Sequence, residues 1–151
     1  MKLNRREMLA LTGGAVAVGA LGIPAIALAK ENPTAADAIK AFTGGAEAAT
    51  GKVNLGTPEI AENGNTVPIS VSVESPMTAD DHVAEVMIVA DGNPRPGVAT
   101  FKFTEMSGEA SASTRIRLAK TQDIIAVAKM SDGSFHMDRK TVKVTIGGCG
   151  G

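Results

Sequence analysis

Hydrophobic and polar residues alternate with a period of two along most of the chain after residue 51. The clearest case is the run from Val67 to Val73, in which every second residue is Val or Ile and the residues between are Pro or Ser. This pattern predicts a strand with one buried face. Pro68 lacks an amide hydrogen, so it predicts a sheet edge or a bulge. Further strands are predicted over residues 82–90, 98–104, 112–118, 124–130 and 135–146, the last with Val142, Val144 and Ile146 facing inward.

Turn signals separate these runs. Asn63-Gly64 and Asp132-Gly133 are typical of tight hairpins, and residues 91–97 form a longer Gly- and Pro-containing loop. About seven short strands at regular spacing predict a mainly β fold, namely an immunoglobulin-like antiparallel β-sandwich. The Cys and Trp that pin true immunoglobulin domains are missing, so the expectation concerns the architecture only.

A short helix is predicted ahead of the strands. Thr34 is a suitable N-cap with Asp37 three residues later, close to a capping box. Apolar residues at positions 38, 39 and 42 share one helical face, and Gly44-Gly45 can end the helix. We expect this helix to lie at the edge of the main body.

The first thirty residues have a different character. A basic head with Arg5 and Arg6 precedes a weakly apolar run over residues 8–23, then Pro24 and a small-x-small site at residues 27–29. This order predicts a secretory signal that is removed on export. Adjacent arginines point to the twin-arginine route.

These features predict three segments. Residues 1–29 form a twin-arginine-type signal peptide, 30–146 a β-sandwich domain, and 147–151 a flexible C-terminal arm. The expected location is the periplasm, with no membrane attachment after cleavage. The alternative is an uncleaved anchor, because residues 8–29 are long enough to span a bilayer.

Charge and aromatic content exclude some functions. The leader holds three of the 15 basic residues and one of the 16 acidic residues, which leaves the mature domain with a formal charge of −3. Nucleic-acid binding requires a basic face, so we expect none. The chain also has no Trp and no Tyr, and therefore few aromatic platforms for stacking.

The chain has one cysteine, Cys149, inside the terminal sequence Gly147-Gly148-Cys149-Gly150-Gly151. Glycine loses much freedom on ordering, so we expect these five residues to form a slim tether that does not pack, with a reach of roughly 17 Å. A thiolate forms mixed disulfides and persulfides. No His or Lys in the tail activates it, so we expect no catalytic residue in this chain and a thiol on which partner enzymes act.

Other roles for Cys149 stay open on chemistry alone. The residue could be incidental in a disordered end, it could anchor the chain to another protein through a disulfide, or it could pack into a core. The disulfide anchor is the main alternative. It predicts a stoichiometric cross-link without exchange of cargo.

The tail, residues 144–151, resembles the ending of SoxY proteins, the sulfur carriers of the periplasmic sulfur-oxidising (Sox) system. The resemblance extends through most of the mature chain, and the segments that carry it are residues 60–64, 75–77, 93–96, 113–119 and 126–133. No residue of the Gly-Gly-Cys-Gly-Gly motif departs from the family pattern.

The resemblance implies that Cys149 carries thiosulfate-derived sulfur. A haem-containing enzyme would conjugate thiosulfate to it, a hydrolase would release sulfate, and a sulfur dehydrogenase would oxidise the remaining sulfur. It also implies a heterodimer with a SoxZ-like β-sandwich subunit and no bound cofactor. A ubiquitin-like carrier that activates its terminal Gly-Gly carboxylate is a further alternative, but such carriers are not exported.

Several other residues invite a binding role. His82, His136 and Met137 suggest copper, but they fall on separate predicted strands, so we expect no metal site. Arg115 and Arg117 share one face of a predicted strand. They are either ordinary exposed charges or a site for anionic cargo or a partner, and the first interpretation is favoured.

Overall fold

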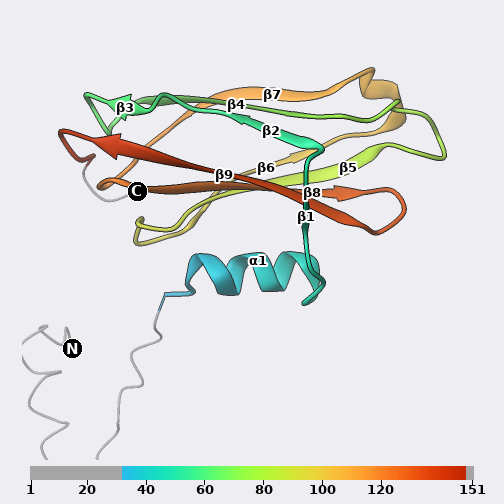
Figure 1. Ribbon diagram of the computed structural model, residues 1–151, viewed down its shortest axis with the longest axis horizontal. Helices are drawn as coiled ribbons and strands as arrows, with labels where there is room; N and C mark the ends of the chain where they lie inside the picture. Colours follow the sequence, from blue (N-terminus) through green and yellow to red (C-terminus); the bar gives the residue numbers. More distant parts are fainter. Residues whose placement is uncertain (1–31, 149–151) are drawn as a thin grey trace, which may run out of the picture. The chain divides into compact units, whose positions relative to one another are not determined.

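The computed structural model describes residues 32–148, which form two facing β-sheets and one helix (Figure 1). The larger sheet contains Ala49–Thr50 (β1), Ile60–Ala61 (β3), Val83–Ala90 (β5), Gly97–Lys102 (β6), Gln122–Met130 (β8) and Phe135–Val144 (β9). The smaller sheet contains Val53–Gly56 (β2), Val67–Val73 (β4) and Ala110–Ile116 (β7). The predicted mainly β sandwich with a short N-terminal helix is therefore confirmed.

The strand order places β6 and β7 at sheet edges. The larger sheet runs β1-β9-β8-β5-β6, with β3 also paired to β9, and the smaller runs β2-β4-β7. The long strands pair antiparallel, as predicted, whereas the two-residue strands β1 and β3 pair parallel with β9. These short parallel pairs have no periodic pattern of their own in the sequence.

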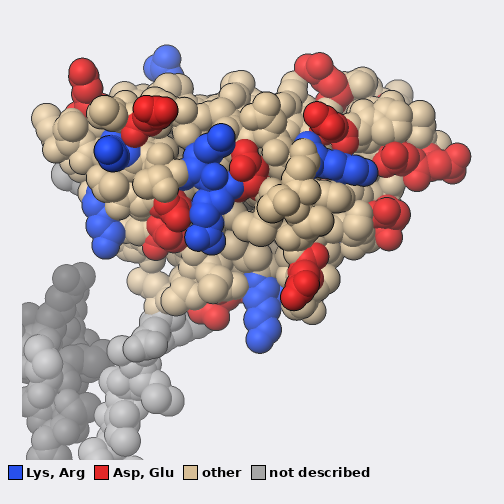
Figure 2. Space-filling model, viewed as in Figure 1, with Lys and Arg blue, Asp and Glu red and all other residues tan. Residues whose placement is uncertain are grey.

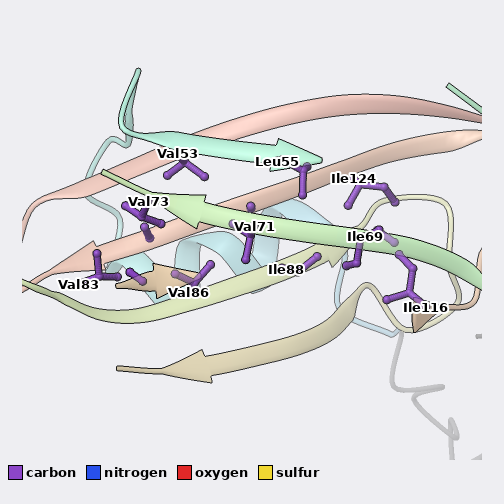
Figure 3. Close-up of a cluster of buried hydrophobic side chains, with 14 of the residues drawn as sticks. Val53, Leu55, Ile69, Val71, Val73, Val83, Val86, Ile88, Ile116 and Ile124 are labelled. Carbon is purple, nitrogen blue, oxygen red and sulfur yellow. The ribbon is translucent and has the colours of Figure 1, made fainter. Parts of the chain in front are cut away.

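Alternating burial fills the space between the sheets. Along β4 each odd-numbered residue is buried and each even-numbered one is exposed, which reproduces the sequence pattern. Figure 3 shows Val and Ile side chains of β2 and β4 on the sheet opposite those of β5. Burial of such side chains stabilises a fold by about 1.5–3 kcal/mol each, so this layer is the main source of stability.

The helix Ala35–Thr43 (α1) covers the outer face of the larger sheet. Thr34 and Asp37 form the predicted capping box, and Gly44 ends the helix with φ of 65°. Phe42 packs edge-on against Phe135 of β9, with ring centroids 5.9 Å apart. The helix lies on the outside of the main body, over a sheet face, because β5 and β8 are apolar on both faces. Val89, Ile125 and Val127 pack with the helix, and the residues between them belong to the core.

Three local features follow the sequence pattern to different degrees. Asp132-Gly133 forms the turn between β8 and β9, as predicted, with Gly133 at φ of 84°. Pro68 was expected at a sheet edge or bulge, but it lies in the central strand of the smaller sheet. It pairs with β7 on one side, and on the other side β2 ends before reaching it. Ile146 was expected to face inward, but it is 68% exposed because β9 ends at Val144.

Candidate functional site

The last described residues, 145–148, lie at one end of the sandwich, together with three loops from distant parts of the sequence (Figure 1). These loops are residues 62–66 between β3 and β4, 91–96 between β5 and β6, and 117–121 between β7 and β8. We call this side the arm end. It positions the start of the Gly-Gly-Cys-Gly-Gly segment.

Backbone hydrogen bonds fix the start of that segment against two of the loops. The Gly64 amide donates to the Ile146 carbonyl at 2.8 Å, and the Gly64 carbonyl accepts from the Leu118 amide at 2.7 Å. The Leu118 carbonyl then accepts from the Gly148 amide at 2.8 Å. We call this set of contacts the arm seat; it consists of Gly64, Leu118, Ala119 and residues 146–148.

Glycine is required in the arm seat because three stretches of backbone meet there. A Cβ on Gly64 would lie 2.3 Å from the Leu118 carbonyl oxygen and 2.7 Å from the Gly148 nitrogen. A Cβ on Gly147 would lie 2.2 Å from the Ala119 oxygen, and one on Gly148 would lie 2.8 Å from the Gly64 oxygen. Real Cβ atoms do not approach other atoms so closely, so any side chain here would displace the seat.

A buried amide network supports the seat from below. Asn93, which is 9% exposed, donates from Nδ2 to the Arg117 carbonyl at 2.8 Å. Its Oδ1 accepts from the Ala119 amide at 3.0 Å and from Nε2 of Gln122 at 2.9 Å. Gln122 also bonds the Lys120 carbonyl and the Gly92 amide. Both side chains therefore hold the 117–121 loop in the position that presents Leu118 to the arm.

The packing of Gly147 and Gly148 differs from the expectation that the whole tail stays clear of the body. Glycine's missing side chain allows close backbone approach, and in this segment that property outweighs its conformational freedom. Cys149, Gly150 and Gly151 lie outside the described residues, as does the predicted signal peptide. The residues that the sequence did not single out are Gly64, read as a turn glycine, and the Asn93–Gln122 pair.

A cleft of about 330 Å³ opens at the arm end between the edge strands β6 and β7. Arg95, Arg115 and Arg117 line it, together with Asn93 and short side chains of the two strands. We call it the arginine cleft. The sequence had singled out Arg115 and Arg117, and the fold adds Arg95 from the loop before β6.

Charges on the rest of the described surface are mixed. Figure 2 shows acidic and basic side chains interspersed over one face, without a large area of either sign. Hydrogen bonds from Ser134 lower the pKa of Asp132, and those from Thr34 lower the pKa of Asp37. Neither carboxylate belongs to the arm seat, so these shifts concern the stability of a turn and a helix cap.

The histidines do not come together as a metal site. His82 Nδ1 lies 3.0 Å from the Thr78 carbonyl, and His136 Nδ1 is buried without a hydrogen-bond partner. Among residues 32–148 no group of three or more His, Cys, Asp or Glu side chains is arranged to hold a metal. In the same part of the chain, no helix is both long and hydrophobic enough to cross a bilayer.

Comparison with protein families gives one match. The model described as "Sulfur oxidation protein SoxY" matches residues 39–149, which is most of the chain and includes Cys149. A search of curated proteins finds no significant match.

Solved structures of similar fold include a member of the same family. The sulfur carrier protein SoxY from Chlorobium limicola f thiosulfatophilum shares 30% identity at a TM-score of 0.61, with 72% of this chain and 89% of that one covered. A superoxide reductase (neelaredoxin) from Ignicoccus hospitalis shares 18% identity at a TM-score of 0.56, covering 62% and 80%. The second similarity is too distant to indicate more than a common fold.

Proposed function

The chain belongs to the SoxY family of sulfur oxidation proteins, and on this premise we propose that it carries sulfur covalently on Cys149 during sulfur oxidation. The observation that carries the proposal is the family match through residue 149, which includes the only cysteine of the chain. The similar structure from Chlorobium limicola is itself described as a sulfur carrier protein. Partner enzymes supply the chemistry, and this chain supplies the thiol.

The proposed loading step is an oxidation. The Cys149 thiolate and thiosulfate form one S–S bond and release two electrons, which a haem-containing partner accepts. Hydrolysis of the resulting S-thiosulfonate then consumes one water, releases sulfate and two protons, and leaves an ionised persulfide on the cysteine. A sulfur dehydrogenase acts on this remaining sulfur. A SoxZ-like subunit completes the carrier as a heterodimer.

In this proposal the two parts of the terminal segment have different roles: its start is held on the body, and Cys149 carries the sulfur. The Leu118 carbonyl holds Gly148, and the Gly64 amide holds Ile146 just before it, so delivery of cargo deep into an enzyme requires these few hydrogen bonds to open. Hydrogen bonds of this kind contribute only about 0.5–1.5 kcal/mol each, so binding to a partner can offset their loss.

We further propose that the protein works in the periplasm after export by the twin-arginine route and cleavage after Ala29. The test is the N-terminus of the mature protein in the producing bacterium and in an Arg5→Lys, Arg6→Lys variant. The proposal is supported if the wild-type mature chain begins at Lys30 and if the variant fails to accumulate in the periplasm. A full-length chain retained in the membrane fraction contradicts it.

The carrier role is tested by intact mass of protein purified from its own periplasm, before and after reduction. We expect additions that match sulfane sulfur, sulfonate or thiosulfonate, that disappear on reduction and that are absent from Cys149→Ser. A thiol that remains unmodified after thiosulfate and periplasmic extract are added contradicts the role. A fixed cross-link to one protein without exchange favours the disulfide anchor. Removal of Gly150 and Gly151 tests the carboxylate alternative, because only that alternative requires them for attachment.

A further inference from the structure

Three arginines from two separate segments converge on one cleft. Arg95 precedes β6, Arg115 lies on β7 and Arg117 follows β7, and all three line the arginine cleft. No Asp or Glu is among the residues that line it. The mature domain is acidic overall, so a concave site whose charged lining residues are all basic is not explained by the average composition.

Within residues 32–148 the three positive charges have no carboxylate partner. Over residues 32–148 the one salt bridge within 4 Å joins Arg139 to Asp123, on β9 and β8. Like charges placed together repel, and a bound anion would convert that repulsion into attraction. The cleft therefore favours a negatively charged ligand on electrostatic grounds.

The walls of the cleft are held in place. The buried Asn93 side chain, itself a lining residue, donates to the Arg117 carbonyl and bonds the Ala119 amide. The strands β6 and β7 each pair on one side only, so each also presents unpaired backbone groups at its free edge. An anion would meet guanidinium groups together with backbone donors on a fixed frame.

We propose that the arginine cleft binds a sulfur oxyanion of the thiosulfate, sulfate or S-thiosulfonate type. Guanidinium groups bind such oxyanions through paired hydrogen bonds, which suits a tetrahedral group with several oxygens. A volume of about 330 Å³ is large enough to admit a small ion or the end of a modified cysteine. The choice of sulfur oxyanions, among all small oxyanions, rests on the proposed function.

The arm seat and the arginine cleft share the loop that begins at Arg117. The Leu118 carbonyl bonds the Gly148 amide at 2.8 Å, Arg117 directly precedes Leu118, and Cys149 directly follows Gly148. Arg117 therefore lines the cleft, and the next residue along the chain bonds the arm. The ligand has two sources, a free ion from solution or cargo on Cys149.

The first experiment titrates the mature Cys149→Ser protein with sodium thiosulfate and sodium sulfate, with sodium chloride at matched ionic strength, and follows backbone amide NMR shifts. We expect saturable shifts in the amides of residues 93, 95, 97–99 and 114–117. Arg115→Gln and Arg117→Gln should each weaken binding roughly tenfold, as expected for a charged hydrogen bond. Lys143→Gln, an exposed charge on β9 outside the cleft, is the matched control.

A second arm distinguishes the two sources. Tetrathionate reacts with the Cys149 thiolate of the wild-type protein, transfers an S–SO₃⁻ group to it and releases thiosulfate. If the cargo occupies the cleft, the loaded protein shows the same shifts without added ion and binds free thiosulfate more weakly. If the ion comes from solution, loading leaves the titration unchanged.

Three results overturn the proposal. One is a set of NMR shifts that change linearly with ion concentration and match those caused by chloride in both arms. Another is an equal loss of affinity in Lys143→Gln and in the arginine variants, which would mark general charge screening. If a partner enzyme changes the NMR shifts of the cleft residues and neither sulfur oxyanion does, the cleft is a surface for protein contact instead. Mass addition at Cys149 is measured separately, so failure of the cleft and failure of the carrier role are distinguishable.

Discussion

The two ends of the sandwich are held by different kinds of hydrogen bond. At the arm end, partners are far apart in sequence: Gly64 with Ile146, Leu118 with Gly148, and Asn93 with Arg117. At the opposite end the β8–β9 turn is closed by Asp132, which accepts from the amide and hydroxyl of Ser134 two residues later.

This difference shows how each end depends on the rest of the fold. The β8–β9 turn is closed by its own residues, and Ser131 at its start also bonds His82 and Asp80 in the β4–β5 loop. The arm end exists only after four segments have assembled. A change at one of its residues should therefore reach the others and the start of the arm, whereas a change in the turn should stay local.

The largest effect is expected from Asn93→Ala. The substitution removes three hydrogen bonds, which run to the Arg117 carbonyl, the Ala119 amide and Gln122. Buried groups left without partners are costly, so the free energy of unfolding should fall by about 2–4 kcal/mol. Urea unfolding measures this loss, and hydrogen exchange of the Gly148 amide should accelerate because Leu118 loses its support.

Asn65→Ala is the matched control, because Asn65 is an exposed asparagine in a neighbouring loop of the same end. It should change stability by less than about 0.5 kcal/mol. Equal losses in the two variants would show that the buried amide network does not hold the arm end.

The second effect distinguishes a glycine that allows close backbone approach from a glycine in open space. Gly64→Ala places a Cβ 2.3 Å from the Leu118 carbonyl oxygen, whereas the Cβ of Gly97→Ala meets nothing within 4 Å. Neither residue has positive φ, so backbone strain does not distinguish them. Overpacking at position 64 should cost about 1–3 kcal/mol.

Reactivity of Cys149 provides a second measurement on the same pair. If Gly64→Ala displaces residues 146–148 from the seat, the rate at which a thiol reagent modifies Cys149 should change in that variant and not in Gly97→Ala. Identical rates and stabilities in the two variants would contradict the requirement for glycine at position 64.

The same contrast explains which parts of the molecule could be predicted from the sequence. Strands with period-two patterns, such as residues 67–73, and the Thr34–Asp37 cap depend on neighbours in the chain, so they were predicted correctly. The Asp132-Gly133 turn is local in the same sense. The two-residue strands β1 and β3 form by pairing with β9, so no periodic pattern in their own residues predicts them.

The candidate site divides in the same way. The sequence identified the Gly-Gly-Cys-Gly-Gly segment and the family it resembles, but it read Asn63-Gly64 as a hairpin turn. Gly64 serves close approach to residues 118 and 148, which lie more than fifty residues away in sequence. Asn93 likewise appears in a loop rich in turn formers, and only the fold brings it beneath the 117–121 loop.

A smaller effect is expected at the opposite end from Asp132→Ala. The variant loses the bonds from the Ser134 amide and hydroxyl, but both partners are exposed and can bond water instead. Stability should fall by less than in Asn93→Ala, and exchange of the Gly148 amide should stay at its wild-type rate. An accelerated Gly148 amide would show that the two ends are coupled through β8 and β9.

The smallest effect is a difference in acid sensitivity between the two ends. Hydrogen bonds from Ser134, with a contribution from Lys52, hold the pKa of Asp132 below its ordinary value of 3.8. A carboxyl group with a lowered folded-state pKa contributes stability that is present above its unfolded pKa and is lost as the pH falls through the folded one. The seat bonds of Gly64, Leu118 and Gly148 involve no titrating group.

The stability difference between wild type and Asp132→Asn should therefore narrow as the pH drops below 3.8, while that between wild type and Gly64→Ala stays constant wherever the protein remains folded. Urea unfolding of the three proteins from pH 6 down through this range measures both differences, and a Gly64→Ala gap that narrows with the Asp132→Asn gap would place a carboxylate in the arm seat as well.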